Sequence, residues 1–440
     1  MKRVRAAAAC QITADPQPLD APGGLHRNGT RGAFTQSSPH RRVGVSGDMR
    51  CALLILAALL IAASPTPADR EGQVALAIDS EARWVPFTLT PGNQIRFDAV
   101  LDGRPVGAIL DTGVSQTVLA RASAAVAPAR LRPDGEATAI GGRVAIEWMP
   151  TAELSFGGLT RTGGGVIVTT LPALATGGAD AIDLLVGRDL LGDAALDIDY
   201  AARRFRLLPT GRLPFRGAIV PLRISPERHV YESELTIGGH RLAPVIVDTG
   251  DGAAVTLTRA DWARAAPAGV ATTSAIAYGL GGAAVSDLGV VPALSLGLLA
   301  ARDVEVRVER EGGFSAAIGV AGRIGSGLLQ RYRVLLDPRA GRMVLSADAA
   351  ADAPAIRSTS GLLVGILADR LRVIHVMRGG PGEAGGWRAG DTICAVDGRS
   401  IAYDYAASPI ARWSVATPGT AVRLHDCTGR EHTLTTRAFY

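Results

Sequence analysis

The fold is decided by Ala108-Ile109-Leu110-Asp111-Thr112-Gly113-Val114-Ser115, where an apolar run leads directly into an acid, a hydroxyl and a glycine. The same order recurs in Val245-Ile246-Val247-Asp248-Thr249-Gly250, with 248 − 111 = 137 positions between the two acids. An acid delivered from a buried strand needs nearby hydrogen-bond donors, because burial disfavours its ionised form. A single Asp-Thr-Gly is a weak signal, but two copies with matched flanks indicate related structural units.

Further landmarks repeat at nearly the same offset. Gly187, within Asp183-Leu184-Leu185-Val186-Gly187-Arg188-Asp189, corresponds to Gly325 in Arg323-Ile324-Gly325, with 325 − 187 = 138. Asp199 likewise corresponds to Asp337, with 337 − 199 = 138. Two long copies rather than many short ones predict a pair of facing lobes, over 75–212 and 213–347, instead of a solenoid.

Short alternating segments separated by glycine predict a mainly-β fold. Each acid is expected at the end of the second strand of a hairpin. The predicted strands and turns are 95–101, Asp102-Gly103 and 106–110 in the first lobe, and 230–237, Gly238-Gly239 and 242–247 in the second.

The net charge of +5 is concentrated in the first 68 residues. That region holds eight basic and three acidic side chains, 8 − 3 = +5, so 69–440 is neutral overall and contains no lysine. A neutral main body lacks the basic surface that nucleic-acid binding requires. The sequence therefore predicts no nucleic-acid partner.

A leader precedes the lobes. Met49-Arg50 is followed by an apolar run over 51–63, which is shorter than the about 18 residues of a membrane span. This pattern predicts a signal peptide over 49–68, cleaved after Ala68 or after Ser64, and an exported mature chain, periplasmic or secreted, without a transmembrane span. Residues 1–48 are either a disordered extension or lie upstream of a true start at Met49.

Residues 348–360, rich in Ala, Asp, Ser and Pro, predict a linker to a third domain over 361–440. This domain is expected to contain strands and a helix from about Tyr403 to Trp413. It holds both cysteines of the mature chain, Cys394 and Cys427. An oxidising compartment would allow them to pair, but two reduced core cysteines fit the sequence as well.

Asp111 and Asp248 are the candidate catalytic residues. Two carboxylates held together cannot both ionise freely, so one stays protonated while the other is a base. The ionised acid can take a proton from a water that attacks a carbonyl, and the protonated acid can polarise the carbonyl oxygen and help protonate the leaving nitrogen. This chemistry requires no covalent nucleophile.

The residues after each acid are candidates for active-site support. Glycine at 113 and 250 allows a sharp turn that directs N–H groups at the carboxylates. Thr112 and Thr249 can brace the two loops by hydrogen bonds, and Ser115 can donate to the first acid.

In these features the chain resembles a two-lobed, retropepsin-like aspartic protease over roughly residues 93–347. The resemblance rests on Asp111-Thr112-Gly113 and Asp248-Thr249-Gly250, and on the apolar-glycine segments Leu185-Val186-Gly187 and Ile324-Gly325. It implies an endopeptidase that acts on a peptide or protein substrate without a cofactor.

The sequence departs from that family at several positions. The hydroxyl often found two residues past the glycine is present at Ser115 but is replaced by Gly252 in lobe two. Arg323 stands where an apolar residue is usual. The flap candidates are Gly141, Gly142, Tyr278 and Gly279; with 279 − 141 = 138, each lobe is expected to carry a hairpin flap.

Residues 361–440 resemble a PDZ domain. The stronger match is Trp387-Arg388-Ala389-Gly390-Asp391 followed by Val396-Asp397-Gly398, and Gly361-Leu362-Leu363-Val364 is the candidate peptide groove. The resemblance implies strand addition of a C-terminal peptide ligand, which would tether substrate or regulate access to the cleft.

Other hydrolase classes find no support. The histidines of the mature chain show no metal-ligand spacing, and there is no Gly-x-Ser-x-Gly elbow. Two alternatives remain open: a catalytically inactive peptide-binding scaffold that uses the same cleft and PDZ groove, and an enzyme whose site forms by pairing lobe one between two chains.

Overall fold

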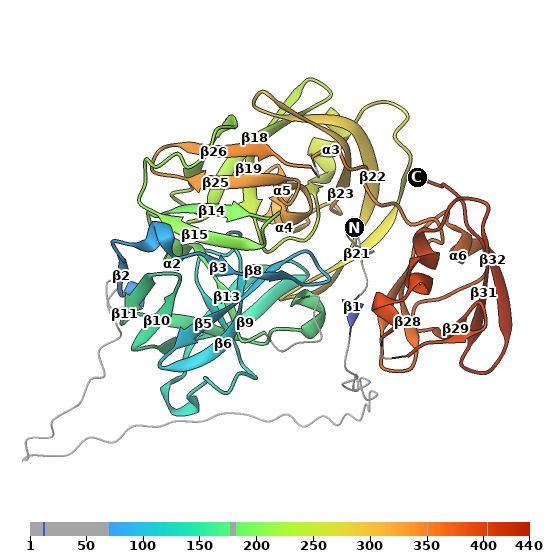
Figure 1. The fold of residues 1–440 in the computed structure, drawn as a ribbon, viewed down its shortest axis with the longest axis horizontal. Helices are drawn as coiled ribbons and strands as arrows, with labels where there is room; N and C mark the ends of the chain where they lie inside the picture. Colours follow the sequence, from blue (N-terminus) through green and yellow to red (C-terminus); the bar gives the residue numbers. More distant parts are fainter. Residues whose placement is uncertain (1–11, 14–69, 177–181, 350, 403) are drawn as a thin grey trace, which may run out of the picture. The chain divides into compact units, whose positions relative to one another are not determined.

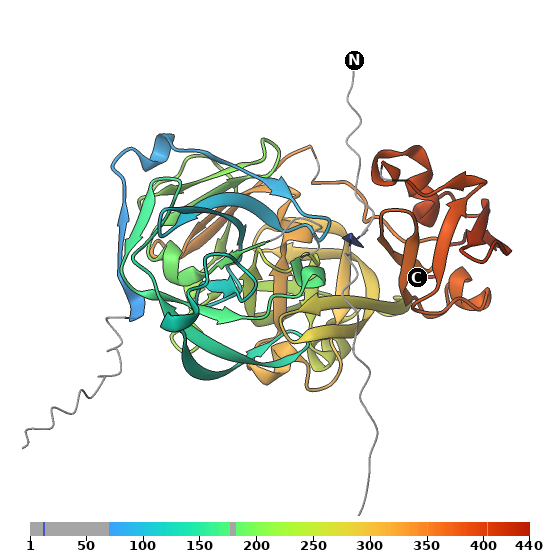
Figure 2. The ribbon, with the colours of Figure 1, turned by 90° about the horizontal axis from the view of Figure 1, so that it is seen from below.

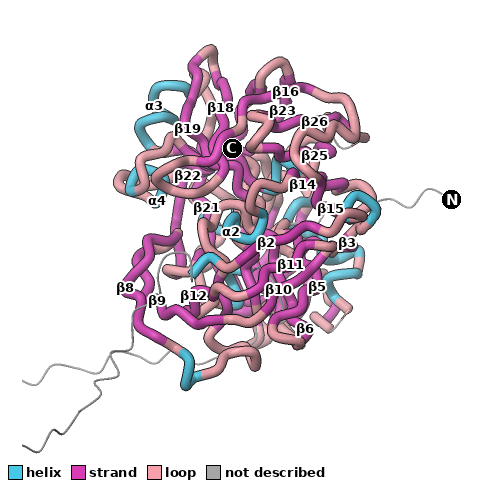
Figure 3. The backbone as a smooth tube through the Cα atoms, turned by 90° about the vertical axis from the view of Figure 1, so that its left-hand side faces the viewer, coloured by secondary structure: helices cyan, strands magenta, loops and turns pink. Residues whose placement is uncertain are grey.

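The computed structural model describes residues 12–13, 70–176, 182–349, 351–402 and 404–440. Strands dominate and the helices are short, so the prediction of a mainly-β chain is confirmed (Figure 3). Apart from residues 12–13, the predicted leader over 1–48 and the signal peptide over 49–68 lie outside these ranges. No helix within them is long and apolar enough to cross a membrane.

Lobe one contains an eleven-stranded sheet (Figure 1). Asp111 directly follows one of the central strands of this sheet. Asp102 and Gly103 both have positive φ, as a tight hairpin turn requires, and join the first two of its central strands. The second of these two strands, β6 (Arg104–Leu110), pairs in parallel with the short apolar strand β13 (Leu184–Val186), and β13 runs antiparallel to β7 (Val118–Ala120). The central strands are β5 (Ile95–Leu101), β6, β13 and β7.

Lobe two repeats this arrangement in an eight-stranded sheet. The strand that ends at Asp248 pairs in parallel with the strand that carries Arg323, and the latter runs antiparallel to a third strand. The central strands are β18 (Tyr231–Ile237), β19 (His240–Asp248), β24 (Gly322–Gly325) and β20 (Val255–Leu257), each within a residue or two of the predicted bounds where these were given.

A six-stranded sheet contains strands from both lobes. Leu196 lies opposite Leu336, and Ile198 lies opposite Val334, where the two lobes meet in antiparallel register. A continuous apolar core contains buried side chains of both lobes, which fixes the two acid-bearing strands relative to each other. The strands, in spatial order, are β16 (Ala218–Pro221), β26 (Arg342–Ala347), β25 (Tyr332–Asp337), β14 (Ala195–Asp199), β15 (Arg204–Leu208) and β3 (Val85–Pro86).

The C-terminal residues, red in Figures 1 and 2, form their own sheet and core. The helix expected over about 403–413 is instead two 3-10 helices, η4 (Tyr405–Ala407) and η5 (Pro409–Val415), because Pro409 lacks the N–H that a continuous helix needs there. The strands are β27 (Leu362–Ile366), β28 (Leu371–Val376), β29 (Thr392–Val396), β30 (Arg399–Ser400), β31 (Ala421–Asp426) and β32 (Glu431–Thr435).

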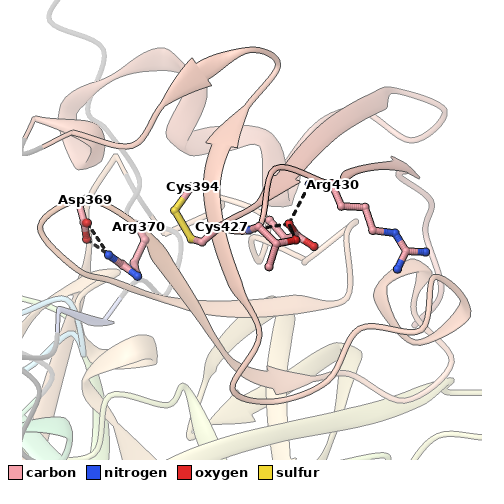
Figure 4. Close-up of a disulfide and its surroundings, with 7 residues drawn as sticks. Asp369, Arg370, Cys394, Cys427 and Arg430 are labelled. Atoms are coloured by element: carbon pink, nitrogen blue, oxygen red, sulfur yellow. Dashed lines mark hydrogen bonds and ion pairs between the residues drawn. A yellow bond between two sulfur atoms is a disulfide. The ribbon is translucent and has the colours of Figure 1, made fainter.

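Cys394 and Cys427 form a disulfide in this C-terminal sheet (Figure 4). Cys394 lies on β29, and Cys427 directly follows the neighbouring strand β31. The bond closes a loop with a sequence separation of 33 residues. Of the two states that the sequence left open, the structure contains the oxidised one.

We predict that the C394A/C427A double variant lowers the free energy of unfolding of the C-terminal domain by about 4 kcal/mol, because a loop of this length gains entropy in the unfolded chain. Hydrogen exchange should show faster opening in residues 362–435 and unchanged protection in the lobes. Dithiothreitol should reproduce this change in the wild type and have no effect on the double variant. Equal protection before and after reduction would contradict the prediction.

Candidate active site

Asp111 and Asp248 lie at equivalent strand ends. The backbone N–H of Asp111 donates to Val186 O at 2.9 Å, which ties the loop after β6 to β13. Asp248 is the last residue of β19 and lies opposite Gly325 of β24. Asp248 is buried, whereas Asp111 retains partial exposure. The structure therefore delivers both acids from buried strands to the junction of the lobes.

Thr112 and Thr249 are fully buried and join the two loops by reciprocal hydrogen bonds. The N–H of Thr112 donates to Thr249 Oγ1, and the N–H of Thr249 donates to Thr112 Oγ1, each at 3.0 Å. Each hydroxyl then donates across the junction, to Val247 O and Leu110 O respectively, at 2.7 Å. We call these four hydrogen bonds the threonine brace. In it, each threonine hydroxyl donates one hydrogen bond and accepts one, both with the backbone of the opposite loop.

Gly113 and Gly250 each lie directly against the acid of the opposite lobe. A Cβ added at Gly113 would lie 2.3 Å from the carboxyl carbon of Asp248, and one added at Gly250 would lie 2.2 Å from that of Asp111. Any side chain at either position would displace a carboxyl group. The glycines thus permit the close approach of the two acids, in addition to the turn that the sequence predicted.

The two carboxylates have different hydrogen-bond partners. Asp111 Oδ1 accepts from Gly113 N at 3.0 Å, whereas Asp248 Oδ1 accepts from both Gly250 N at 3.0 Å and Asp251 N at 2.9 Å. Burial, the charge of Asp248 and a hydrogen bond with it raise the pKa of Asp111 well above its usual value. Burial and the charge of Asp251 raise the pKa of Asp248 to about 6, against the opposing effect of Arg323.

A buried ion cluster lies behind Asp248. Arg323 Nε is 3.0 Å from Asp251 Oδ2 and 3.7 Å from Asp248 Oδ2, and its Nη1 is 2.8 Å from Glu309 Oε1. The sequence marked Arg323 only as a departure from an apolar position. Asp251 and Glu309 were missed, because nothing in their local sequence distinguishes them from solvated acids.

Ser115 and Gly252 differ from the expected supporting hydroxyls. Within the described residues, no hydrogen bond joins the Ser115 side chain to Asp111; its carbonyl accepts from Asp189 N. A Cβ at Gly252 would lie 1.8 Å from Gly92 O of a lobe-one loop, so no hydroxyl-bearing residue fits there. The second N–H donor to Asp248, from Asp251, stands in place of that hydroxyl.

The lobe-one loop that excludes a side chain at position 252 also holds the loop that follows Asp248. Gln94 Nε2 donates to Gly250 O at 2.9 Å, and Asn93 Nδ2 donates to Gly252 O at 3.1 Å. Gln94 is buried, and Asn93 has φ of 63°. Sequence reasoning missed both residues, since a polar pair in a turn is ordinarily solvated.

Both lobes carry a hairpin, and the two hairpin tips meet. Gly281 N donates to Ile140 O at 2.9 Å, and a Cβ at Gly141 would lie 2.4 Å from Gly282 O, so the tips pack backbone against backbone. Leu280 packs against an apolar cluster of lobe one that includes Trp148. The hairpin strands are β8 (Arg132–Ala139) and β9 (Gly142–Pro150), and β21 (Thr272–Gly279) and β22 (Gly282–Leu296).

The flap candidates thus lie at or beside these tips. Gly141 is in the first tip and Gly142 opens β9, while Tyr278 and Gly279 end β21. A Cβ at Gly279 would lie 2.5 Å from Ile140 Cβ, which shows how closely the tips approach. Tyr278 is half-buried, and burial raises the pKa of its hydroxyl against the opposing charge of Arg372.

The predicted peptide groove over 361–364 belongs largely to the C-terminal core. Leu362 and Val364 are buried, and Gly361, at φ 71°, packs against Gly380. The N–H groups of Gly361 and Leu362 donate to the hydroxyls of Ser358 and Ser360. The structure therefore gives these residues a packing role, and the strand that pairs with the outer edge of β27 is β1 (Ile12–Thr13).

The chemistry of the site is that of its two acids. Among the described residues, no group of three or more His, Cys, Asp or Glu side chains could hold a metal ion. The two carboxyl groups lie close together, and burial raises the pKa of both, which favours a state in which one of them is protonated. Such a pair can activate a water and polarise a carbonyl.

Comparison with known proteins places lobe one in context. Residues 97–190 match the family model described as "Aspartyl protease". The match includes Asp111, Thr112 and Gly113 together with the Gly187 segment, and it ends before lobe two. No curated protein sequence matches the chain. The matched domain supports a protease and implies a peptide substrate.

We predict that Thr112→Val lowers the free energy of unfolding by about 1–3 kcal/mol, because it leaves Thr249 N and Val247 O without their partners at a buried junction. Thr112→Ser keeps both hydrogen bonds and should lose less stability. Thr88→Val, at an exposed strand position, should stay within about 0.5 kcal/mol of the wild type. Urea denaturation measures all three; equal losses for Val and Ser at 112 would contradict the role of the hydroxyl.

Proposed function

We propose that the protein is an exported aspartic endopeptidase that hydrolyses peptide bonds with a water activated between Asp111 and Asp248. The observation that carries this proposal is the reciprocal close approach of Gly113 to Asp248 and of Gly250 to Asp111. A structural acid would not require glycine beneath the acid of the other lobe. The disulfide and the predicted signal peptide support an oxidising compartment outside the cytoplasm.

The reaction follows from a dyad that holds one proton. Ionised Asp248 takes a proton from water, and the resulting hydroxide attacks the peptide carbonyl carbon while Asp111 gives its proton to the carbonyl oxygen. Asp248 then gives its proton to the leaving nitrogen as the C–N bond breaks, and Asp111 recovers a proton from a hydroxyl of the tetrahedral intermediate. The cycle ends with one proton on the dyad.

The alternatives are disfavoured by particular contacts. A site formed by pairing lobe one between two chains is unnecessary, since the threonine brace joins Thr112 and Thr249 of a single chain. A binding protein without activity could use the same cleft, but it would gain nothing from two poorly hydrated acids with raised pKa values, because their desolvation costs stability. The endopeptidase is therefore the stronger proposal.

The C-terminal domain is proposed to be a PDZ-like module that binds an extended peptide. In support, β1 (Ile12–Thr13) pairs with β27, with Ile12 opposite Gly365, at the edge where an added strand would dock. The domain also contacts the hairpin of lobe two, where His375 Nε2 lies 2.8 Å from Ser274 Oγ on β21. A peptide on β27 could thereby influence the flap, through β28.

We predict that Asp111→Asn and Asp248→Asn each lower kcat/KM for peptide cleavage by about 10²–10⁴-fold or more, because each removes an acid–base group. Asp98→Asn is the matched control; this acid is exposed on β5 and should leave kcat/KM within about twofold. A digest of a peptide library by the purified mature chain measures the effect. Cleavage by either dyad variant at the wild-type rate would contradict the mechanism.

The pH dependence of stability offers a test that does not need a substrate. A raised native pKa means that Asp111 stabilises the fold below its usual value of 3.8, and that this contribution is lost as the pH rises through the native pKa. We therefore predict that Asp111→Asn is more stable than the wild type at pH 7, with the difference vanishing towards pH 4. Denaturation across this range measures it; a destabilised variant at pH 7 would indicate a structural capping acid instead.

A further inference from the structure

Arg323 is a buried cation within reach of one acid of the dyad only. Its side chain is 5% exposed, and its Nε lies 3.7 Å from Asp248 Oδ2 and 3.0 Å from Asp251 Oδ2. Burial of an unpaired guanidinium is very costly, so such a group is found only where carboxylates compensate it. One of the carboxylates that compensate the charge of Arg323 is that of Asp248, which the proposed reaction uses.

Residues behind Arg323 hold its guanidinium in place. Glu309 Oε1 accepts from Nη1 at 2.8 Å, and Ser315 Oγ lies 2.9 Å from the same nitrogen. Glu309 also accepts from Ser315 N at 2.8 Å, and the Phe314 ring lies 5.3 Å from the guanidinium carbon. Ser315 and Phe314 belong to α4 (Phe314–Ala317), so this short helix contributes two of the contacts that hold the guanidinium.

Lobe one shows that the fold does not need a cation at this position. Leu185 of β13 lies opposite Ile109, two residues before Asp111, and Arg323 of β24 lies opposite Ile246, two residues before Asp248. The two positions are thus equivalent, and 323 − 185 = 138 keeps the offset of the repeat. A leucine fills the position in lobe one and packs with its apolar cluster. The arginine therefore serves something other than the architecture of the lobe.

The other members of the ion cluster are absent from lobe one as well. Asp251 follows Asp248 by three positions, and the residue at that place after Asp111 is Val114. The positions equivalent to Arg323 and Asp251 are therefore charged beside Asp248 and apolar beside Asp111. Lobe one has a buried ion pair of its own, with Arg161 Nη1 3.5 Å from Asp189 Oδ2, but within the described residues this pair is hydrogen-bonded to Thr117 and Thr151 and forms no ion pair with Asp111. Symmetric strands carry an asymmetric charge distribution.

We propose that Arg323 is a positioning residue that keeps Asp248 as the ionised member of the dyad, which assigns Asp248 as the base and Asp111 as the acid. This inference rests on the proposed function, because the roles have meaning only in a hydrolytic cycle. The effect of Arg323 on the charge of Asp248 is argued from geometry, because Arg323 Nε lies 3.7 Å from Asp248 Oδ2 within the same lobe.

Neighbouring charges act in both directions on Asp248. Burial alone would raise the pKa of Asp251, but the charges of Arg323 and Arg307 outweigh it, so Asp251 is ionised and opposes the ionisation of Asp248. Carboxylates keep Arg323 charged despite its burial. Among the described residues, the charged groups that face Asp248 directly or through this cluster are Asp111, Asp251, Arg323, Glu309 and Arg307.

The test measures the titration of the Asp248 carboxyl carbon by NMR in the full mature chain labelled with ¹³C-aspartate, assigned with Asp111→Asn and Asp248→Asn. Arg323→Met removes the cation and keeps an unbranched chain; we expect the midpoint of Asp248 to rise by about one pH unit or more. Asp251→Asn removes the nearest competing anion, and the midpoint should fall. Arg323→Lys retains the charge and should leave the midpoint closer to the wild type than Arg323→Met does.

The two variants are expected to shift the Asp248 midpoint in opposite directions. A general loosening of the site would shift the midpoint in the same direction in both variants, so it can be distinguished from the proposed effect. If Arg323→Met does not fold, Asp251→Asn decides, because the inference requires a lower midpoint once Arg323 faces Asp248 without that competitor. Unchanged midpoints, or shifts of the same sign in the two variants, overturn the inference.

The pH profile of kcat/KM separates this inference from the proposed function. If the chain cleaves peptides, the acidic limb should follow the NMR midpoints, upward in Arg323→Met and downward in Asp251→Asn, with about tenfold activity change per pH unit on that limb. Cleavage with an unmoved limb and unmoved midpoints would reject the role of Arg323 and leave the endopeptidase intact. Shifted midpoints without cleavage would reject the endopeptidase and retain the electrostatic assignment.

Discussion

The structure depends on holding two like-charged acids together in a poorly solvated junction. Each carboxylate loses hydration there, and each raises the pKa of the other when ionised. Ionisation of both acids at this junction therefore destabilises the folded state. Asp111 and Asp248 are nevertheless approached by backbone N–H groups at about 3 Å, which recover part of that cost for the ionised form. The remainder must come from the packing of the two lobes.

That packing explains why the loops tolerate so few residue types. The threonine brace needs, on each loop, a buried hydroxyl that both donates to and accepts from the backbone of the opposite loop. Gly113 and Gly250 must lack a side chain because each faces a carboxyl carbon. The shared sheet and the continuous core then hold this arrangement rigid, as a site for proton transfer requires.

Sequence reasoning predicted the features that a linear pattern encodes. The hairpins before Asp111 and Asp248, the recurrence of the apolar-glycine segments and a hairpin flap in each lobe all follow from local patterns repeated at a fixed offset. The contacts of Gln94 with Gly250 and of Glu309 with Arg323 could not be predicted, since they join residues 156 and 14 positions apart through tertiary structure. The prediction of one helix from about Tyr403 to Trp413 was wrong, because Pro409 interrupts the hydrogen bonding that the apolar periodicity alone does not reveal.

The two lobes share their backbone features and differ in the charged residues beside the acids. The family match stops at residue 190, although lobe two repeats the strand order, the brace and the glycine of lobe one. Lobe two departs where the ion cluster stands, at Asp251 and Arg323, and at Gly252, where a lobe-one loop occupies the space of a side chain. The backbone of the repeat is thus kept while the charges beside one acid are changed. A pair of equivalent acids would share a proton without preference, whereas a cation on one side gives the pair a direction, which is what a reaction with one base and one acid requires.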